Sequence, residues 1–181
     1  MLDDRLALLL HPVRLRLVHA LRADGKLTTR ELCARLPELP KATIYRQVER
    51  LARGGVFEVE SERRVRGAVE RRYRLVPEAA AVSADDARTM TIEDHRRVFP
   101  AAMAALMADF DTYLDRPDAA PFADQVSYRQ YVLWLTPMER ARFIAELGRL
   151  LRSLSPSQPN DDGAPYLLST VFFPANRGKT A

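Results

Sequence analysis

The chain has 181 residues, of which 47% are hydrophobic and 29% charged, which fits one large domain or two small ones with a packed core. Its formal net charge of +4 is unevenly spread, because residues 1–75 hold 17 Lys and Arg against 10 Asp and Glu, whereas residues 76–181 hold 11 against 14. A net of +7 followed by −3 indicates a polyanion-binding module joined to a part of different function. Cys33 is the only cysteine, which excludes an intramolecular disulfide and a multi-cysteine metal site within one chain.

The N-terminal region predicts a cytoplasmic protein with an early helix. Asp3 and Asp4 stand where a secretory signal peptide carries basic residues, and no stretch is apolar for long enough to span a bilayer. Pro12 suits the first turn of a helix, and Asp24-Gly25 ends that helix with the glycine as a left-handed cap. We therefore expect a helix over residues 12–24 and no membrane partner.

A helix-turn-helix is predicted from residue 28 onward. Residues 28–31 read Thr-Thr-Arg-Glu, a capping box that opens a short helix with Leu32 and Leu36 on its inner face. Pro37 and Pro40 then bracket a tight turn to the next helix. Two short helices joined by such a turn are typical of a helix-turn-helix.

The third helix, predicted from about Pro40 to Arg53, has one apolar stripe and one polar face. The stripe recurs at spacings of four and three residues and consists of Ile44, Val48 and Leu51. Polar residues off this stripe lie mostly in the first two turns, which reach base edges when a recognition helix enters the major groove. The predicted DNA contacts on this helix are Lys41, Thr43, Tyr45, Arg46 and Arg50. Lys41 and Arg46 are the strongest candidates, because Lys and Arg bind both phosphates and guanine edges.

An arginine-rich hairpin follows the third helix. Residues 57–60 and 69–75 alternate between apolar and polar side chains, which predicts two strands. The turn between them contains Arg63, Arg64 and Arg66. A solvated charged loop is the plain interpretation of such a run. Behind a helix-turn-helix, the same run predicts a wing whose tip contacts the phosphate backbone or a minor groove.

A short helix over residues 83–90 and a longer one over 91–114 are predicted after the hairpin. Pro100 is expected to kink the longer helix or to divide it. The apolar residues of that helix form a seam that fits either a core or a dimer helix. We favour the dimer helix, because a winged helix of this type reads a two-fold DNA site with a second subunit.

Beyond this helix the sequence predicts a small strand–helix–strand module. Gln125–Leu135 and Tyr166–Phe173 are predicted strands, and Thr136–Glu139 is a strong helix start between them. Their aromatic side chains either line a pocket or pack on one face of a sheet, and we favour packing; they include Tyr128, Tyr131, Trp134, Tyr166 and Phe172. The predicted fold is α+β, with a winged helix-turn-helix domain over 1–76 and a dimerisation and effector domain over 77–181.

The first 75 residues resemble the ArsR-like winged-helix regulators of bacteria. The resemblance is carried in order by HPVRLRLVHAL, LTTRELCARL, ATIYRQVERLARGGVFEV and the basic hairpin RRVRGAVERRYRL. The order and spacing of these elements are more specific than any one of them. The resemblance implies a homodimer that binds an operator in double-stranded DNA and represses or activates transcription, often under the control of a small-molecule effector.

One departure from that family concerns metal sensing. Metal-sensing members carry two nearby cysteines, whereas residues 31–35 read ELCAR and contain only Cys33. A thiolate site needs several converging ligands, so we expect no metal and no cofactor, and we expect Cys33 to be a small buried apolar residue. The sequence also lacks paired catalytic carboxylates, a Gly-rich phosphate loop and a Ser-His-Asp arrangement, so we expect no enzyme activity.

Three classes of function follow. The leading one is a DNA-binding transcription regulator, in which the wing and the third helix bind phosphates and the start of that helix reads bases. A winged-helix module that binds protein or RNA is one alternative, although the basic polar face of the third helix argues against it. The other is a module that senses a ligand in its rear half without sequence-specific DNA binding.

Overall fold

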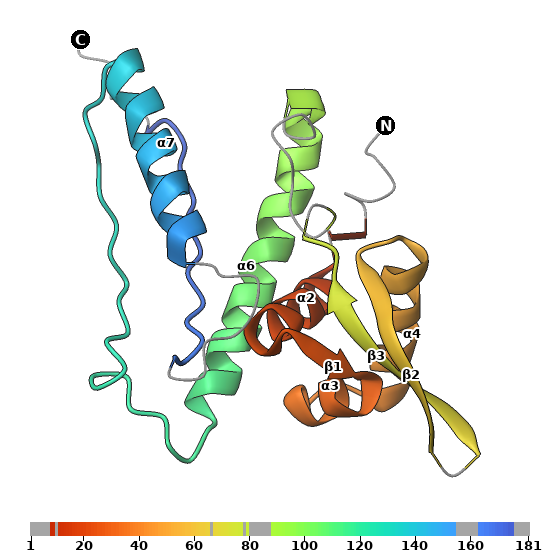
Figure 1. The fold of residues 1–181 in the computed structure, drawn as a ribbon. Helices are drawn as coiled ribbons and strands as arrows, with labels where there is room; N and C mark the ends of the chain where they lie inside the picture. The colour runs from red at the N-terminus through yellow and green to blue at the C-terminus, as the bar shows by residue number, and fades with distance from the viewer. Residues whose placement is uncertain are drawn as a thin grey trace. The chain divides into compact units, whose positions relative to one another are not determined.

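The computed structural model describes residues 8–9, 11–65, 67–77, 79, 88–154 and 163–175 (Figure 1). The chain divides into two compact units, residues 1–115 and residues 116–181. Each unit is described by itself below.

The first unit contains a winged helix-turn-helix. Its helices are α2 (Pro12–Asp24), α3 (Thr29–Arg35) and α4 (Lys41–Arg53), and its strands are β1 (Lys26–Thr28), β2 (Phe57–Val65) and β3 (Ala68–Leu75). The strands form one antiparallel sheet in the order β1-β3-β2, and β2 and β3 extend as a long hairpin, the wing (Figure 1). Strand β1 was not predicted, because three residues directly before a capping box are too short to show an alternating pattern.

Local signals in the sequence set the helix boundaries of this unit. Gly25 has a φ of 75° and donates its N–H to the carbonyl of Leu21, which confirms the predicted cap of α2. The predicted capping box is also confirmed, since the Thr28 hydroxyl accepts from the Glu31 N–H and the Glu31 carboxylate accepts from the Thr28 N–H. Gly55, with a φ of 71°, follows the end of α4.

One apolar core lies between the three helices and the sheet. The predicted stripe of α4 is confirmed, because Ile44, Val48 and Leu51 are all buried. The stripe packs in a core to which every element of the winged helix contributes; its largest buried side chains also include Leu17, Leu21, Leu32, Val56 and Phe57. Burial of this stripe fixes the rotation of α4 about its axis, and the polar face of the helix is turned to solvent.

The wing contains an irregularity that reorients its side chains. The β2–β3 register pairs Val59 with Tyr73 and then Ser61 with Arg72, so Glu60 is an extra residue on β2. Residues in direct register share a face of the sheet, and successive residues alternate between faces. Arg63 therefore lies on the same face as Glu70, and Arg64 lies on the opposite face.

Helix α6 (Ile92–Leu114) completes the first unit by packing against α2. Thr91 and Asp94 form a capping box at its start, and the helix ends where it was expected to end. It runs through Pro100 as one helix rather than two, and that residue is exposed. The predicted helix over 83–90 lies almost wholly outside the described residues.

The second unit contains helix α7 (Pro137–Leu154), which begins at the predicted Thr136–Glu139 capping box. The two predicted strands on either side of it, residues 125–135 and 166–173, are wrong for this structure, because neither pairs with another strand among the described residues. Their side chains favour a strand, but a strand also needs a hydrogen-bonded neighbour. No helix within the described ranges is long and apolar enough to cross a membrane.

Candidate nucleic-acid interface

Helix α4 presents the predicted contact residues on its solvent face. Lys41, Tyr45, Arg46 and Arg50 are exposed, with 56% of the Tyr45 surface accessible, and Thr43 is half-buried. Pro40 is the N-cap, so these side chains begin directly after the turn that joins α3 to α4. The buried stripe keeps them on one side, as a helix that enters a DNA groove requires.

Many exposed basic side chains of the winged helix already have an acidic partner. Across the β2–β3 pair, Arg71 bonds Glu62 at 2.8 Å, and Arg74 bonds Glu58 at 2.8 Å. The other such pairs are Arg72–Glu31, Lys26–Glu60, Arg35–Asp24 and Arg53–Glu49. These six cations are neutralised within the protein, so they contribute less to the external field than their number suggests.

A second group of basic side chains holds no ion pair with any described residue. Its members are Lys41, Arg46, Arg50, Arg63 and Arg64, all exposed and all predicted as DNA contacts. We call these five residues the unpaired basic set. Arg66, the remaining predicted contact, lies outside the described residues. The unpaired basic set keeps its donors available to an external anion, which is what phosphate contacts require.

Arg30 has the same properties and was missed by the sequence reasoning. It lies in the first turn of α3, is exposed, and shares no ion pair with a described residue. The first helix of a helix-turn-helix crosses the DNA backbone, so a cation at its start suits a phosphate. Its position two residues after the capping threonine, Thr28, is the signal that would have identified it.

The start of α2 adds positive charge beside α4. Burial lowers the pKa of His11 below its ordinary value, and the charges of Arg14, Arg50 and Arg46 lower it further, in that order. Burial also lowers the pKa of Arg14, and Arg50 contributes to that shift. The positive field on this side of the molecule therefore comes from α2 as well as from α4.

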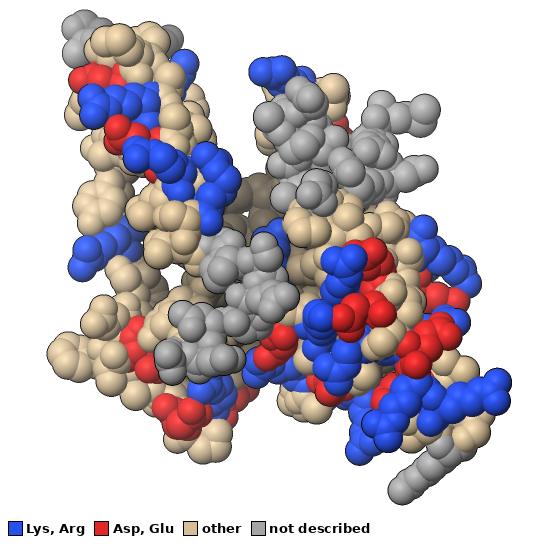
Figure 2. Space-filling model, viewed as in Figure 1, with Lys and Arg blue, Asp and Glu red and all other residues tan. Residues whose placement is uncertain are grey.

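Basic side chains also gather at the end of the wing. Figure 2 shows blue side chains concentrated over the end of the hairpin, whereas blue and red alternate over the sheet. Because successive residues of a strand alternate between faces, Arg63 and Arg64 project from opposite faces of the ribbon. Gly67, with a φ of 84°, lies in the connection between the strands. A two-stranded ribbon with cations on both faces can contact both walls of a groove.

A buried arginine ties α6 to the turn in front of α4. Arg16, on α2, is only 4% exposed. Its guanidinium lies 2.6 Å from Asp109 and donates to the hydroxyl of Thr112 at 2.8 Å, both on α6. It also lies 2.5 Å from Glu38, in the turn between α3 and α4. One side chain therefore holds three elements that are far apart in the sequence.

The acidic partner of Arg16 is itself well satisfied. The second carboxylate oxygen of Asp109 lies 2.7 Å from Nδ1 of His19, one turn along α2 from Arg16. Burial by itself raises the pKa of Asp109, but the hydrogen bonds to His19 and Arg16 outweigh it, so the pKa lies below its ordinary value. The carboxylate is thus charged at neutral pH and fully engaged.

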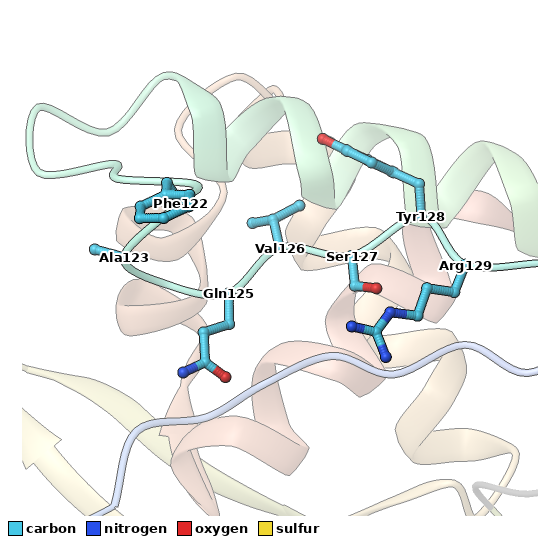
Figure 3. Close-up of a pocket in the computed structure, with 7 residues that line it drawn as sticks. All are labelled: Phe122, Ala123, Gln125, Val126, Ser127, Tyr128 and Arg129. Carbon is cyan, nitrogen blue, oxygen red and sulfur yellow. The ribbon is translucent and has the colours of Figure 1, made fainter.

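Three other kinds of site were considered: a reactive cysteine, a metal site and a ligand pocket. Cys33 is half-buried, and burial raises the pKa of its thiol while Lys41 opposes the shift. The described residues contain no group of three His, Cys, Asp or Glu side chains placed to hold a metal ion. An open hollow of about 700 Å³ in the second unit is lined by residues 122, 123 and 125–129 alone (Figure 3). A hollow walled by one extended stretch encloses no ligand.

Comparison with known families agrees with the geometry of the first unit. Residues 9–60 match the family model described as a helix-turn-helix domain. This part of the chain is a helix-turn-helix domain of the ArsR type, which confirms the resemblance seen in the sequence. The match covers less than a third of the chain. No curated protein matches the sequence.

Proposed function

We propose that the protein is a non-enzymatic, cytoplasmic transcription regulator that binds double-stranded DNA through α4 and the wing. The observation that carries this proposal is the distribution of ion pairs. The unpaired basic set lies on α4 and near the tip of the wing, whereas the basic residues of β1 and β3 are neutralised by glutamates. These are the two elements by which a winged helix-turn-helix approaches DNA.

The predicted contacts on α4 and on the wing have different tasks in this proposal. Lys41, Thr43, Tyr45 and Arg46 lie in the first two turns of α4, so they are placed to reach base edges in the major groove. Arg50 lies further along the same face and suits a phosphate. Arg63, Arg64 and Arg66 suit the backbone or an adjacent minor groove.

We further propose that the protein acts as a homodimer. One winged helix contacts one half-site, and a second copy is needed to read a two-fold operator. Helix α6 carries exposed apolar residues, among them Phe99, Met107 and Leu114, that suit a dimer contact. Residues 77–181 would then provide dimerisation and, where an effector exists, its binding site.

Equilibrium binding to a labelled duplex tests this proposal. The purified protein is titrated into a random duplex and into its own upstream region at salt concentrations from about 50 to about 200 mM. Four phosphate contacts per subunit, from Arg50, Arg63, Arg64 and Arg66, predict a slope of log K against log salt of about −3 to −4 for each subunit bound. Selection from a random library should return a two-fold symmetric sequence. Absence of duplex binding at the lowest salt rejects the proposal.

A further inference from the structure

The second unit contains two extended segments that pair with no strand among the described residues. Residues 127–135 and 163–173 are exposed throughout, and neither pairs with a strand among the described residues. No backbone hydrogen bond joins residues 129–133 or 163–173 to another described residue. Exposed extended backbone of this kind is a template for pairing with another strand.

The side chains of these segments are those of strands with a covered face. Figure 3 shows Val126 and Tyr128 pointing to one side of the chain and Gln125, Ser127 and Arg129 to the other, the two-residue period of a strand. Large apolar side chains are exposed along both segments, among them Tyr128, Val132, Trp134, Tyr166, Leu168, Val171 and Phe173. Proteins that act as monomers rarely leave so much contiguous apolar surface in water.

The described residues of the second unit also form no core of their own. No described residue between 116 and 175 is buried, whereas the winged helix buries a continuous apolar cluster. The segment 163–173 is anchored to α7 through Phe172, whose ring centroid lies 5.4 Å from that of Phe143. The two segments run along α7 on either side of it in Figure 1. Two segments that lie apart on either side of one helix form no sheet among the described residues, because a sheet needs hydrogen-bonded neighbours.

The charges of the two segments identify the partner. Between residues 125 and 135 only Arg129 is charged, and residues 163–173 carry no charge. A nucleic acid or a strongly charged protein surface therefore finds no complement here. An identical segment does, because apolar and aromatic surfaces without charge are complementary to themselves.

We propose that the unit of residues 116–181 is completed by a second copy of this chain, whose extended segments pair with residues 127–135 and 163–173 in one shared sheet. Two copies supply four strands and two α7 helices, which make a two-layer structure with one apolar interior. Pairing with the second copy gives the exposed backbone groups hydrogen-bond partners, and it also covers the exposed aromatic residues. This inference rests on the homodimer of the proposed function and assigns its interface.

Hydrogen–deuterium exchange on the full chain tests this inference directly. Sedimentation first gives the dimer dissociation constant, and exchange is then measured well above and well below it. Above it, the amides of 127–135 and 163–173 should exchange at least tenfold more slowly than below it. The amides of the β2–β3 pair serve as the internal control and should show no concentration dependence, because that pairing lies within one chain.

A proline pair tests the backbone requirement. Leu168 is 65% exposed and Ile92 is 74% exposed, so neither side chain is needed by the fold of one chain. Leu168→Pro removes a strand N–H donor and should weaken the dimer at least tenfold. Ile92→Pro places proline at the first position of α6, where it is tolerated, and should leave the dimer unchanged.

Several outcomes overturn the inference. A chain that stays monomeric, a dimer whose two segments exchange at unprotected rates, or protection that persists in the monomer each contradict pairing with a second copy. An unchanged dissociation constant in Leu168→Pro does so as well. The proposed function is judged separately by salt-dependent duplex binding, which the winged helix of the Leu168→Pro variant should retain.

Discussion

The arginines of the winged helix fall into two groups that composition alone does not separate. Arg71 and Arg74 on β3 each bond a glutamate across the strand pair, whereas Arg63 and Arg64 on β2 hold no ion pair with a described residue. On α4, Arg53 bonds Glu49, whereas Arg46 and Arg50 hold none. The basic charge of the module therefore has two uses. Part of it forms ion pairs within the protein, and the rest is left for an external anion.

The largest expected effect is at Arg16, because this ion-paired arginine is buried. Arg16→Met removes a buried cation and leaves the half-buried Asp109 without it, so the free energy of unfolding should fall by about 3 kcal/mol. Urea denaturation measures the change. The matched control is Arg35→Met, which breaks an exposed pair with Asp24 and should cost about 1 kcal/mol or less. Equal losses in the two variants would contradict the distinction between buried and exposed pairs.

The next prediction compares an arginine without an ion pair and an arginine with one on the same helix, α4. Arg46→Ala should weaken binding to the selected operator by about 1–3 kcal/mol, because it removes a donor placed to reach a base edge or a phosphate. Arg53→Ala removes a cation that Glu49 already neutralises and should change binding by less than about 0.5 kcal/mol. Fluorescence anisotropy with the labelled operator gives both values. A larger loss in Arg53→Ala would reverse the assignment.

The wing allows the same comparison through salt dependence. The double variant Arg63→Ala/Arg64→Ala should reduce the slope of log K against log salt by about 2 per subunit, since each phosphate contact contributes about 0.9. Arg71→Ala/Arg74→Ala removes the same formal charge from paired positions and should reduce the slope much less. If both double variants change the slope equally, net charge rather than the absence of an ion pair controls binding.

The smallest effect concerns pH. Burial, Arg14, Arg50 and Arg46 lower the pKa of His11, so the folded chain keeps this histidine neutral where the unfolded chain protonates it. The stability that depends on neutral His11 is fully present above the ordinary value of 6.5 and is lost as pH falls below it toward the lower folded pKa. Thermal melts between pH 7.5 and pH 5 (a window of about one unit or more on each side of 6.5) should show this loss in the wild type and a smaller one in His11→Asn. His95→Asn, which removes an exposed histidine of α6, is the control. An identical profile in His11→Asn and the wild type would contradict this prediction.

Much of the first unit could be predicted because its signals are local. The caps at Gly25, Thr28 and Thr91 and the stripe of α4 are each legible within one or two turns of chain. The division of the arginines was not predictable. Arg63 and Arg71 look alike in the sequence, and each faces a glutamate in the β2–β3 register, but only Arg71 forms an ion pair, with Glu62.

In the second unit, local signals predicted the helix but not the pairing of the segments beside it. The start of α7 at Thr136 is a local signal and was predicted, but residues 125–135 and 166–173 pair with no strand in the part of the chain that the structure describes. Side-chain composition favours extended backbone, and it does not say where the neighbouring strand comes from. Sequence patterns therefore described the conformation of these segments and not their partner.

The contacts of Arg16 lie close to the C-terminal end of α6. Asp109 lies about six residues before the end of the first unit at Asp115, which is about 9 Å of helix at 1.5 Å per residue. Helix α6 is therefore fixed near its C-terminal end by the Arg16 guanidinium, which also forms an ion pair with Glu38. The C-terminal end of α6 therefore lies less than two helical turns from the side chain that holds the turn before α4.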